Sequence, residues 1–208
     1  MEFFTNANIL AYLVAYLIGA IPFGLVLAKV YAGVDVKSEG SKSIGATNVL
    51  RVVKQKDPAL AKKLGAATLA LDALKGVVVL LIAMAVGFDD TVLWGMAFFA
   101  VLGHCYSPYL MFEGGKGVAT GVGVVAVMLP LEAMIGLAVW FGMAKFLRIS
   151  SLSSLAGLVT AVAASFIMHP GLGEVNSQIP LVLIALLIIY KHIPNIIRLF
   201  KGEEKASI

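Results

Sequence analysis

A short glycine-rich segment carries the residues of this chain that are best suited to binding a phosphate. It reads Gly114-Gly115-Lys116-Gly117 and lies between two apolar stretches. Glycines allow several backbone N–H groups to converge on one anion, and the lysine adds a full positive charge. The segment is not a P-loop, because Gly117 stands where that motif needs Ser or Thr, so ATP hydrolysis is not expected. The alternative is a flexible turn whose lysine only helps to fix the membrane topology.

A second polar segment, residues 39–51, combines glycines and hydroxyl side chains with an asparagine and an arginine. Arg51 can present a two-pronged donor to phosphate oxygens, while Ser41 and Asn48 can donate without adding charge. The segment is therefore a candidate phosphate clamp. The alternative is an ordinary solvated loop that ends in a Ser or Thr cap before a helix at about 46–54.

A third polar group lies near the end of the chain. His192, Asn195 and Arg198 recur every three residues, which places them along one slanting stripe of a helix. A basic helix end that reaches the membrane surface would account for Arg198, but it would not require His192 or Asn195. We therefore expect this stripe to contribute to a binding or catalytic site.

Further polar residues lie at or within apolar segments. His104 is either a general base or a structural histidine bonded to a neighbouring helix. Ser154 belongs to a serine-rich start of an apolar segment, where hydroxyls bind an anion or cap the helix. Asp72 and Lys75 lie three residues apart within another apolar segment, so they share one helix face as a functional or structural pair.

The elements that position these residues must be membrane helices. Of the 208 residues, 60% are hydrophobic and 13% are charged, and the mean hydropathy is +0.96. This composition predicts an all-α, polytopic membrane protein formed by one domain, residues 1–208. Seven apolar segments are candidate transmembrane helices: 8–31, 65–87, 92–111, 117–131, 132–147, 152–168 and 179–200.

The segments 117–131 and 132–147 are short for a bilayer crossing. About 15 residues of helix reach only about 22 Å across a hydrocarbon core of about 30 Å. They form either two tilted spans or a re-entrant hairpin, which would leave five full crossings. Glu132 at their junction favours a tip that reaches water. We therefore expect seven spans.

The basic residues predict the side of the membrane on which the polar segments lie. Most lysines and arginines fall in residues 37–63, in the glycine-rich segment, in residues 145–148 and after residue 190. The alternate connections carry acidic residues and no lysine or arginine. Since basic loops stay in the cytoplasm, we expect the N-terminus outside, the C-terminus in the cytoplasm and a site that faces the cytoplasm.

Composition also excludes several classes of site and partner. The one cysteine, Cys105, allows no intrachain disulfide, and no carboxylates or histidines have the spacing of metal ligands. The net charge of +4 suits anionic lipid headgroups or phosphates, and no nucleic-acid-binding module is present in the sequence. We expect no metal, no cofactor, no nucleic acid and no obligatory protein partner, and a lipid bilayer as the surroundings.

Together, the polar segments resemble the motifs of the bacterial acyl-phosphate:glycerol-3-phosphate acyltransferases, an integral membrane family. The matching residues occur in the family's order: Gly40-Ser41, Gly45-Ala46-Thr47-Asn48 and Arg51; Gly103-His104 and Gly114-Gly115-Lys116-Gly117-Val118-Ala119-Thr120; His192, Asn195, Arg198, Gly202 and Glu204. The likeness covers nearly the whole chain. Lys37, Lys42, Ser43 and Glu113 depart from the family pattern, so the resemblance assigns them no role.

The resemblance implies transfer of a fatty acyl group from acyl phosphate to the primary hydroxyl of glycerol 3-phosphate. The products would be lysophosphatidic acid and phosphate, in the first acylation of phospholipid synthesis at the bacterial inner membrane. On this hypothesis Lys116 and the N–H groups of Gly114 to Gly117 bind a phosphate or the developing oxyanion.

The same hypothesis gives roles to the other two segments. Arg51, Ser41 and Asn48 would clamp a second phosphate, with help from Ser154. His192 and Asn195 would hold the acceptor, and Arg198 would contribute to substrate binding. Either His192 or His104 would act as general base, unless a substrate phosphate accepts the proton.

Two rival functions follow from the same residues. A transporter or channel for an organic phosphate would use the basic loops as a gate, but it predicts polar residues through the whole membrane depth. The sequence offers little of that kind beyond Asp72 and Lys75. A membrane phosphatase with a histidine nucleophile is the second rival. The His-x4-Asp motif of another acyltransferase class is absent, which argues against coenzyme A as a required donor.

Overall fold

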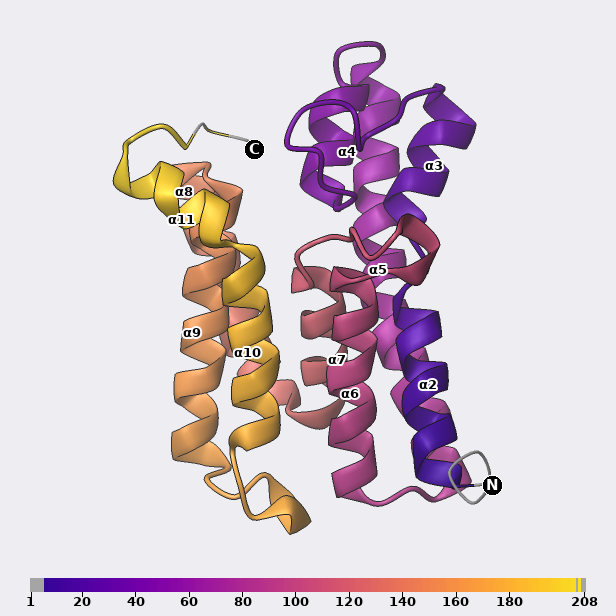
Figure 1. The fold of residues 1–208 in the computed structure, drawn as a ribbon. Helices are drawn as coiled ribbons and strands as arrows, with labels where there is room; N and C mark the ends of the chain where they lie inside the picture. The colour runs from indigo at the N-terminus through magenta and orange to yellow at the C-terminus, as the bar shows by residue number, and fades with distance from the viewer. Residues whose placement is uncertain (1–5, 205, 207–208) are drawn as a thin grey trace.

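The computed structural model describes residues 6–204 and 206, and this part of the chain is all-helical with no β-strand (Figure 1). The first apolar segment forms two helices, α2 (Ala7–Gly19) and α3 (Phe23–Ala32). They are separated at Pro22, which has no N–H to continue the hydrogen bonding of α2 and starts α3 instead. Together they form a 26-residue apolar segment that is long enough to cross a membrane.

The next two helices pack against each other at the basic end of the molecule. Helix α4 (Ala46–Val53) lies where a helix at about 46–54 is predicted, but its cap is Gly45 rather than Ser or Thr. Helix α5 (Pro58–Val86) is the longest, with 29 residues. Its N-terminus is capped by Asp57, whose Oδ1 accepts the N–H groups of Ala59 and Leu60.

Two further helices complete this group. Helix α6 (Asp90–Cys105) packs closely along α2, and α7 (Val118–Met128) packs along α5. The approach of α2 to α6 needs glycine, since a Cβ on Gly103 would lie 2.1 Å from the carbonyl oxygen of Tyr16. Between α6 and α7 run a 3-10 turn, Pro108–Leu110, and the glycine loop, residues 114–117.

The remaining helices stand beside this group in Figure 1. Helices α8 (Pro130–Leu147) and α9 (Ser150–Met168) form a closely packed pair, and α10 (Ile179–Lys191) lies between that pair and α6. Helix α11 (Ile193–Phe200) continues α10 after a bend of 58°. The start of α2 and the helix α11 lie at opposite ends of the bundle (Figure 1).

Helices form in all seven segments that are predicted to span the membrane. Four described helical segments are long and apolar enough to cross: α2 with α3, α5, α8 and α9. The bent pair of α10 and α11 makes a fifth, while α6 has 16 residues and α7 has 11. The structure is that of a polytopic, all-α membrane protein. Seven crossings, and the sides on which the termini lie, stay predictions.

The junction of α7 and α8 differs from the prediction in two ways. Helix α8 is not short, because it begins at Pro130 and has 18 residues. Proline suits the first position of a helix, where its missing N–H costs no hydrogen bond. The prediction that Glu132 reaches water was wrong: its side chain is fully buried and pairs with His169, which follows α9. A histidine 37 residues away thus replaces water as its partner.

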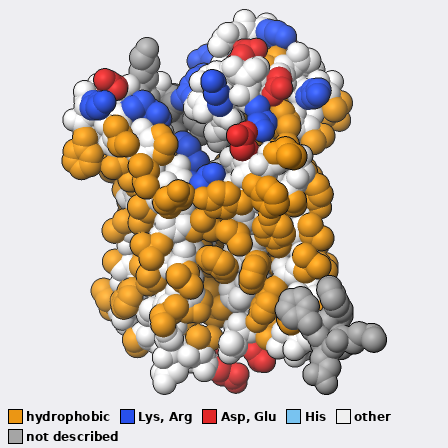
Figure 2. Space-filling model, in the orientation of Figure 1, with side chains coloured by type: hydrophobic (Ala, Val, Ile, Leu, Met, Phe, Trp, Pro, Cys, Tyr) orange, Lys and Arg blue, Asp and Glu red, His pale blue; other side chains and the backbone are white. Residues whose placement is uncertain are grey.

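The surface agrees with a membrane environment. Figure 2 shows a broad band of hydrophobic side chains across the middle of the visible face of the bundle. Lysine and arginine gather at the end that carries α4 and α11, together with several acidic side chains, whereas the opposite end shows acidic side chains and no lysine or arginine (Figure 2). The polar segments of interest therefore share the basic end.

Candidate active site

A large cavity separates α4, α5 and α7 from α8, α9 and α10. Its volume is about 950 Å³, and it is polar at the basic end and apolar along the rest of its length. Ten of the twelve predicted site residues line it: Ser41, Asn48, Arg51, His104, Lys116, Gly117, Ser154, His192, Asn195 and Arg198. The other two, Gly114 and Gly115, line a smaller neighbouring pocket. Three segments far apart in sequence thus meet at one place, while their roles in binding and catalysis stay predictions.

The glycine loop is folded tightly against His104. The N–H of Gly115 donates to the His104 carbonyl oxygen at 2.9 Å, so this N–H is not free for an anion. A Cβ on Gly115 would lie 2.1 Å from His104 Nε2, and a Cβ on Gly114 would lie 2.1 Å from the His104 carbonyl oxygen. Gly117 has φ +83° and caps α7. The folded shape of the loop therefore requires glycine at these positions, whether or not the loop binds an anion.

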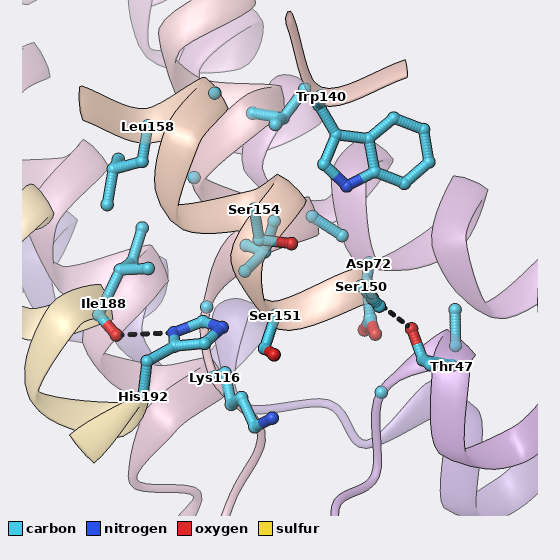
Figure 3. Close-up of a pocket in the computed structure, with 18 of the residues that line it drawn as sticks. Thr47, Asp72, Lys116, Trp140, Ser150, Ser151, Ser154, Leu158, Ile188 and His192 are labelled. Atoms are coloured by element: carbon cyan, nitrogen blue, oxygen red, sulfur yellow. Dashed lines mark hydrogen bonds between the residues drawn. The ribbon is translucent and has the colours of Figure 1, made fainter. Parts of the chain in front are cut away.

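Lys116 projects from this loop into the cavity, close to Ser151 and His192 (Figure 3). Burial lowers the pKa of Lys116 from its ordinary 10.5 to about 8, and the charges of Arg198 and Arg51 act in the same direction. The carboxylate of Glu204 opposes this fall. A dianion in the cavity would restore the proton affinity of Lys116, so the site is electrostatically prepared for a phosphate.

His104 belongs to a buried polar cluster beneath the loop. Lys75 Nζ lies 2.8 Å from Asp72 Oδ1 and 2.9 Å from His104 Nδ1, and it donates to the carbonyl oxygen of Ile21 at 3.0 Å. The predicted pairing of Asp72 with Lys75 on one helix face is confirmed. Of the two alternatives for His104, this geometry favours the structural one, because its imidazole contacts Lys75 of α5 and its backbone carbonyl oxygen accepts the N–H of Gly115 in the glycine loop.

Asn48 shapes the first polar segment from within. Its Nδ2 donates to the carbonyl oxygens of Val36 and Ser43, both at 2.9 Å, and its Oδ1 accepts the N–H of Ser41 at 2.8 Å. The side chain is buried and both of its N–H bonds are engaged. This argues against the predicted direct donation of Asn48 to a phosphate and favours a positioning role for it.

Arg51 is better placed to meet a substrate. It lies in the last turn of α4, whose apolar side is buried through Val49, Val52 and Val53. Arg51 therefore faces the cavity, and no described carboxylate forms an ion pair with it. Across the cavity, the hydroxyl groups of Thr47 and Ser150 lie 3.0 Å apart and join α4 to the start of α9 (Figure 3).

The third polar segment is organised around a carboxylate that the sequence interpretation gave no role. Glu204 Oε1 accepts from Asn195 Nδ2 and from Ser151 Oγ, both at 2.6 Å, and Glu204 Oε2 accepts from Arg198 Nε at 2.6 Å. Burial raises the pKa of Glu204, but the three hydrogen bonds outweigh it and hold that pKa below its ordinary value. The position of Glu204 six residues after Arg198 was the one sequence feature that could have indicated this contact.

His192 stands at the bend between α10 and α11. Its Nδ1 lies 2.8 Å from the carbonyl oxygen of Ile188, as the dashed line in Figure 3 shows. Since a carbonyl oxygen only accepts, Nδ1 carries the proton, and the lone pair of a neutral ring is on Nε2. A neutral His192 with this tautomer can accept a proton from a bound hydroxyl group.

The apolar part of the cavity forms a corridor between the two groups of helices. Ala70 and Ala73 of α5 line one side, with Val125 of α7, and they face the side chains of α8, α9 and α10. Trp140 and Leu158 line the corridor and lie beyond Ser154, on the side of Figure 3 away from Lys116. The opposite wall consists of these residues: Ala133, Gly136, Leu137, Trp140, Leu158, Ala161, Val162, Leu181, Ile184 and Ile188. The cavity can therefore hold a polar group joined to a long apolar chain.

The chain matches the family model for glycerol-3-phosphate acyltransferase over residues 9–202. It belongs to the glycerol-3-phosphate acyltransferase family. A relative of that description from Sulfurimonas denitrificans is 66% identical over 208 residues and is covered completely, as is this chain. Another from Aliarcobacter butzleri is 63% identical, also over 100% of both chains.

A solved structure agrees with this assignment. The integral membrane glycerol 3-phosphate acyltransferase PlsY, in its glycerol 3-phosphate form, is 37% identical with a TM-score of 0.83. The match covers 97% of this chain and 96% of that one. The resemblance stated from the motifs is thereby confirmed. The protein is an integral membrane acyltransferase of phospholipid biosynthesis that acylates glycerol 3-phosphate.

The described residues contain no group of three or more His, Cys, Asp or Glu side chains that could hold a metal ion. The groups that surround the polar end are cations, amides, hydroxyl groups and the carboxylates of Asp72, Glu203 and Glu204. Such a set of groups is chemically suited to binding and orienting anions. It can also move a proton at His192.

Proposed function

We propose that this acyltransferase takes its acyl group from acyl phosphate. The observation that carries the proposal is the direct junction of a basic, hydrogen-bonding chamber with the apolar corridor in one cavity. Acyl phosphate has a dianionic head joined to a long hydrocarbon chain, so one molecule fits both parts. Burying the chain in the corridor is favourable by about 0.8 kcal/mol for each CH₂ group. The head would then lie beside Lys116.

The reaction proceeds by attack of the primary hydroxyl of glycerol 3-phosphate on the acyl carbon. A new ester C–O bond forms, the bond from the acyl carbon to the phosphate oxygen breaks, and phosphate leaves with the electron pair. Lysophosphatidic acid is the other product. Because the acyl group is already activated, the enzyme needs orientation and charge stabilisation more than a nucleophile of its own.

Each polar element has a part in this step. Lys116 neutralises the leaving phosphate or the oxyanion that develops on the acyl carbonyl. Arg51, Ser41 and Ser154 bind the phosphoryl group of the acceptor, and Asn48 holds their loop in shape. His192 Nε2 accepts the hydroxyl proton, unless the departing phosphate takes it instead.

The C-terminal residues complete the chamber. Asn195 and Arg198 line it while they hold Glu204, so helix α11 and the segment after it cover the polar end. We propose that this end faces the cytoplasm at the inner membrane of a bacterium, as the basic loops predict. The 208 residues would then work as one domain without a cofactor or an obligatory protein partner.

The test is a donor assay on the purified full chain in lipid nanodiscs. It compares a long-chain acyl phosphate with the corresponding acyl-coenzyme A, each with and without glycerol 3-phosphate. We expect lysophosphatidic acid and free phosphate only when acyl phosphate and the acceptor are both present. Ester formation with acyl-coenzyme A but not with acyl phosphate would contradict the donor assignment. Release of phosphate from acyl phosphate in the absence of glycerol 3-phosphate would indicate a phosphatase.

Two variants show whether the cavity performs the reaction. Arg51→Gln should raise the KM for glycerol 3-phosphate, because it removes a cation that lines the chamber. Lys56→Gln removes an exposed lysine that lines neither pocket, and it should behave like the wild-type protein. Equal activity in both variants would place the acceptor somewhere else.

A further inference from the structure

The apolar corridor ends at the short connection between α7 and α8. Helix α7 belongs to one wall of the corridor and α8 to the other, and Leu129 is the single residue between them. Val125, one turn before this connection, and Ala133, one turn after it, both line the cavity. The chain therefore crosses from wall to wall at the end of the corridor away from Lys116, which we call the far end. The corridor has a floor there.

The floor is closely packed. Leu129 is buried, its N–H donates to the carbonyl oxygen of Val125 at 2.7 Å, and its carbonyl oxygen accepts the N–H of Ala133 at 3.0 Å. Leu181 at the start of α10, and Leu172 from the connection between α9 and α10, belong to the same buried hydrophobic cluster as Leu129. A hydrocarbon chain that reaches the far end therefore meets packed side chains.

A polar cluster braces the floor beside α8. Glu132, next to Ala133, is fully buried and pairs with His169, which follows α9. Gln178, just before α10, donates to the carbonyl oxygen of His169 and accepts from Ser165 Oγ at 3.1 Å. An apolar chain that pushed past the floor would have to disturb these hydrogen bonds, and leaving buried polar groups unpaired is unfavourable. The floor is thus a firm boundary.

Two helices give the same length for the corridor. Leu181 lies eleven residues before His192 along α10, and Val162 lies eleven residues after Ser151 along α9. His192 and Ser151 stand at the polar end of the cavity, whereas Leu181 and Val162 line its apolar part. At a rise of about 1.5 Å per residue, each pair spans about 16 Å. A chain of carbons joined by single bonds of about 1.5 Å advances about 1.25 Å per carbon when extended, so about 13 carbons fill this length.

We propose that the far end of the corridor limits the length of the acyl chain that the protein transfers, with Ala133 and Leu181 as specificity-determining residues. A chain of up to about 13 carbons lies wholly inside the corridor, whereas a longer chain has to fold back or leave between the two groups of helices. The inference rests on the proposed function in one respect, that the corridor holds the acyl chain. It does not depend on the group that activates the acyl carbon.

The two residues allow changes of opposite sign at the same place. Ala133 is small and buried, so a leucine there adds three carbons to the far end of the corridor. Leu181 is large and buried, so an alanine there removes three carbons from it. The first change should shorten the longest chain that fits, and the second should lengthen it.

The experiment is a competition between two donors, with the full chain in lipid nanodiscs. Decanoyl phosphate, which is shorter than the corridor, and palmitoyl phosphate, which is longer, are offered as an equal mixture with glycerol 3-phosphate. The two lysophosphatidic acids are then quantified by mass spectrometry. Every variant receives the same mixture, so the partition of the donors between water and lipid affects all of them equally.

In Ala133→Leu, the ratio of long-chain to short-chain product should fall roughly fivefold or more, because the added carbons crowd only the longer donor. In Leu181→Ala, the same ratio should rise roughly twofold to fivefold. Ala138→Leu and Leu186→Ala are the matched controls, since they make the same exchanges at exposed positions of α8 and α10 that do not line the cavity. Both controls should keep the wild-type ratio.

Ratios equal to those of the matched controls would overturn the proposal. The two products form in one sample, so their ratio does not depend on the fraction of the protein that is folded. Should Ala133→Leu fail to fold at all, Leu181→Ala decides the question alone: a ratio at or below that of Leu186→Ala would overturn the length limit.

The same competition with decanoyl- and palmitoyl-coenzyme A separates this inference from the donor assignment, because the ratio is measured in the ester product and not in the leaving group. Shifted ratios that appear only with the coenzyme A donors would leave the length limit standing while the donor assignment fails. Unshifted ratios with acyl phosphates that are good donors would overturn the length limit and leave the donor assignment intact.

Discussion

Replacing Lys116 with methionine should stabilise the protein while removing its activity. The pKa of Lys116 falls from 10.5 to about 8 because the ammonium group is partly buried. Each tenfold loss of proton affinity is worth about 1.4 kcal/mol, so the fall corresponds to about 3 kcal/mol against the folded state. The side chain is partly exposed, and solvent screening reduces the expected effect to about 1–2 kcal/mol. Methionine has a similar length and no charge, and it removes this cost.

The dependence on pH gives the sign of the effect. Below pH 8, Lys116 is protonated in both the folded and the unfolded chain, so the full cost is present. Between about 8 and 10.5, the folded chain binds fewer protons than the unfolded one, and stability rises with pH. The cost disappears above that window. The gain in folding stability from Lys116→Met should therefore be largest near pH 7. It should shrink as the pH rises from about 8 to 10.5.

The assay is thermal unfolding in detergent, followed by the fluorescence of Trp94 and Trp140. Lys116→Met should unfold a few degrees higher than the wild-type protein at pH 7, with turnover reduced roughly 100-fold or more. Lys56→Met, at an exposed position, serves as the matched control and should change neither quantity. A lower unfolding midpoint for Lys116→Met, or substantial remaining turnover, would refute the idea that the buried Lys116 ammonium group destabilises the fold and is needed to bind phosphate.

Three further changes test other parts of the site. In Glu204→Gln, the decline of kcat/KM above about pH 8 should move to lower pH, because the Glu204 carboxylate raises the pKa of Lys116. An unchanged pH profile would mean that deprotonation of Lys116 does not cause the decline. Val162→Phe should narrow the corridor and raise the KM several-fold for a long-chain donor but not for a short-chain one. The matched control Val159→Phe lies on the exposed side of the same helix and should leave both KM values unchanged. Equal effects in the two variants would show that the corridor does not hold the acyl chain of the donor. In His104→Gln, loss of the imidazole beside Lys75 and Gly115 should lower the free energy of unfolding by about 1–3 kcal/mol and reduce turnover. A variant that is as stable as the wild-type protein and slow only at low pH would instead identify His104 as the general base.

Much of the local structure follows from sequence patterns that act over a few residues. The helix at 46–53 follows a glycine and begins an amphipathic stretch, and Asp72 and Lys75 pair because three residues bring them to one helix face. These features depend on backbone geometry and spacing, which the sequence states directly. The convergence of the three polar segments is a different case, because it was expected from the resemblance to a family whose motifs occur in the same order.

The features that escaped prediction depend on contacts between distant segments. Glu132 is buried because His169 reaches it from the loop after α9, and no local pattern indicates that pairing. Glu204 lies in the site because Ser151, 53 residues earlier, faces it from the start of α9. The hydrogen bonds by which Asn48 shapes its loop depend on carbonyl groups whose positions appear only in the folded chain.

The stoichiometry of the two products tests whether the acyl group passes directly from acyl phosphate to glycerol 3-phosphate. The wild-type protein in nanodiscs is given acyl phosphate and glycerol 3-phosphate, and lysophosphatidic acid and inorganic phosphate are measured together over time. We expect the two products to appear in equal amounts, and neither to appear above background when glycerol 3-phosphate is omitted. Phosphate released in excess of lysophosphatidic acid, or lysophosphatidic acid formed without phosphate release, would contradict direct transfer from acyl phosphate in this cavity.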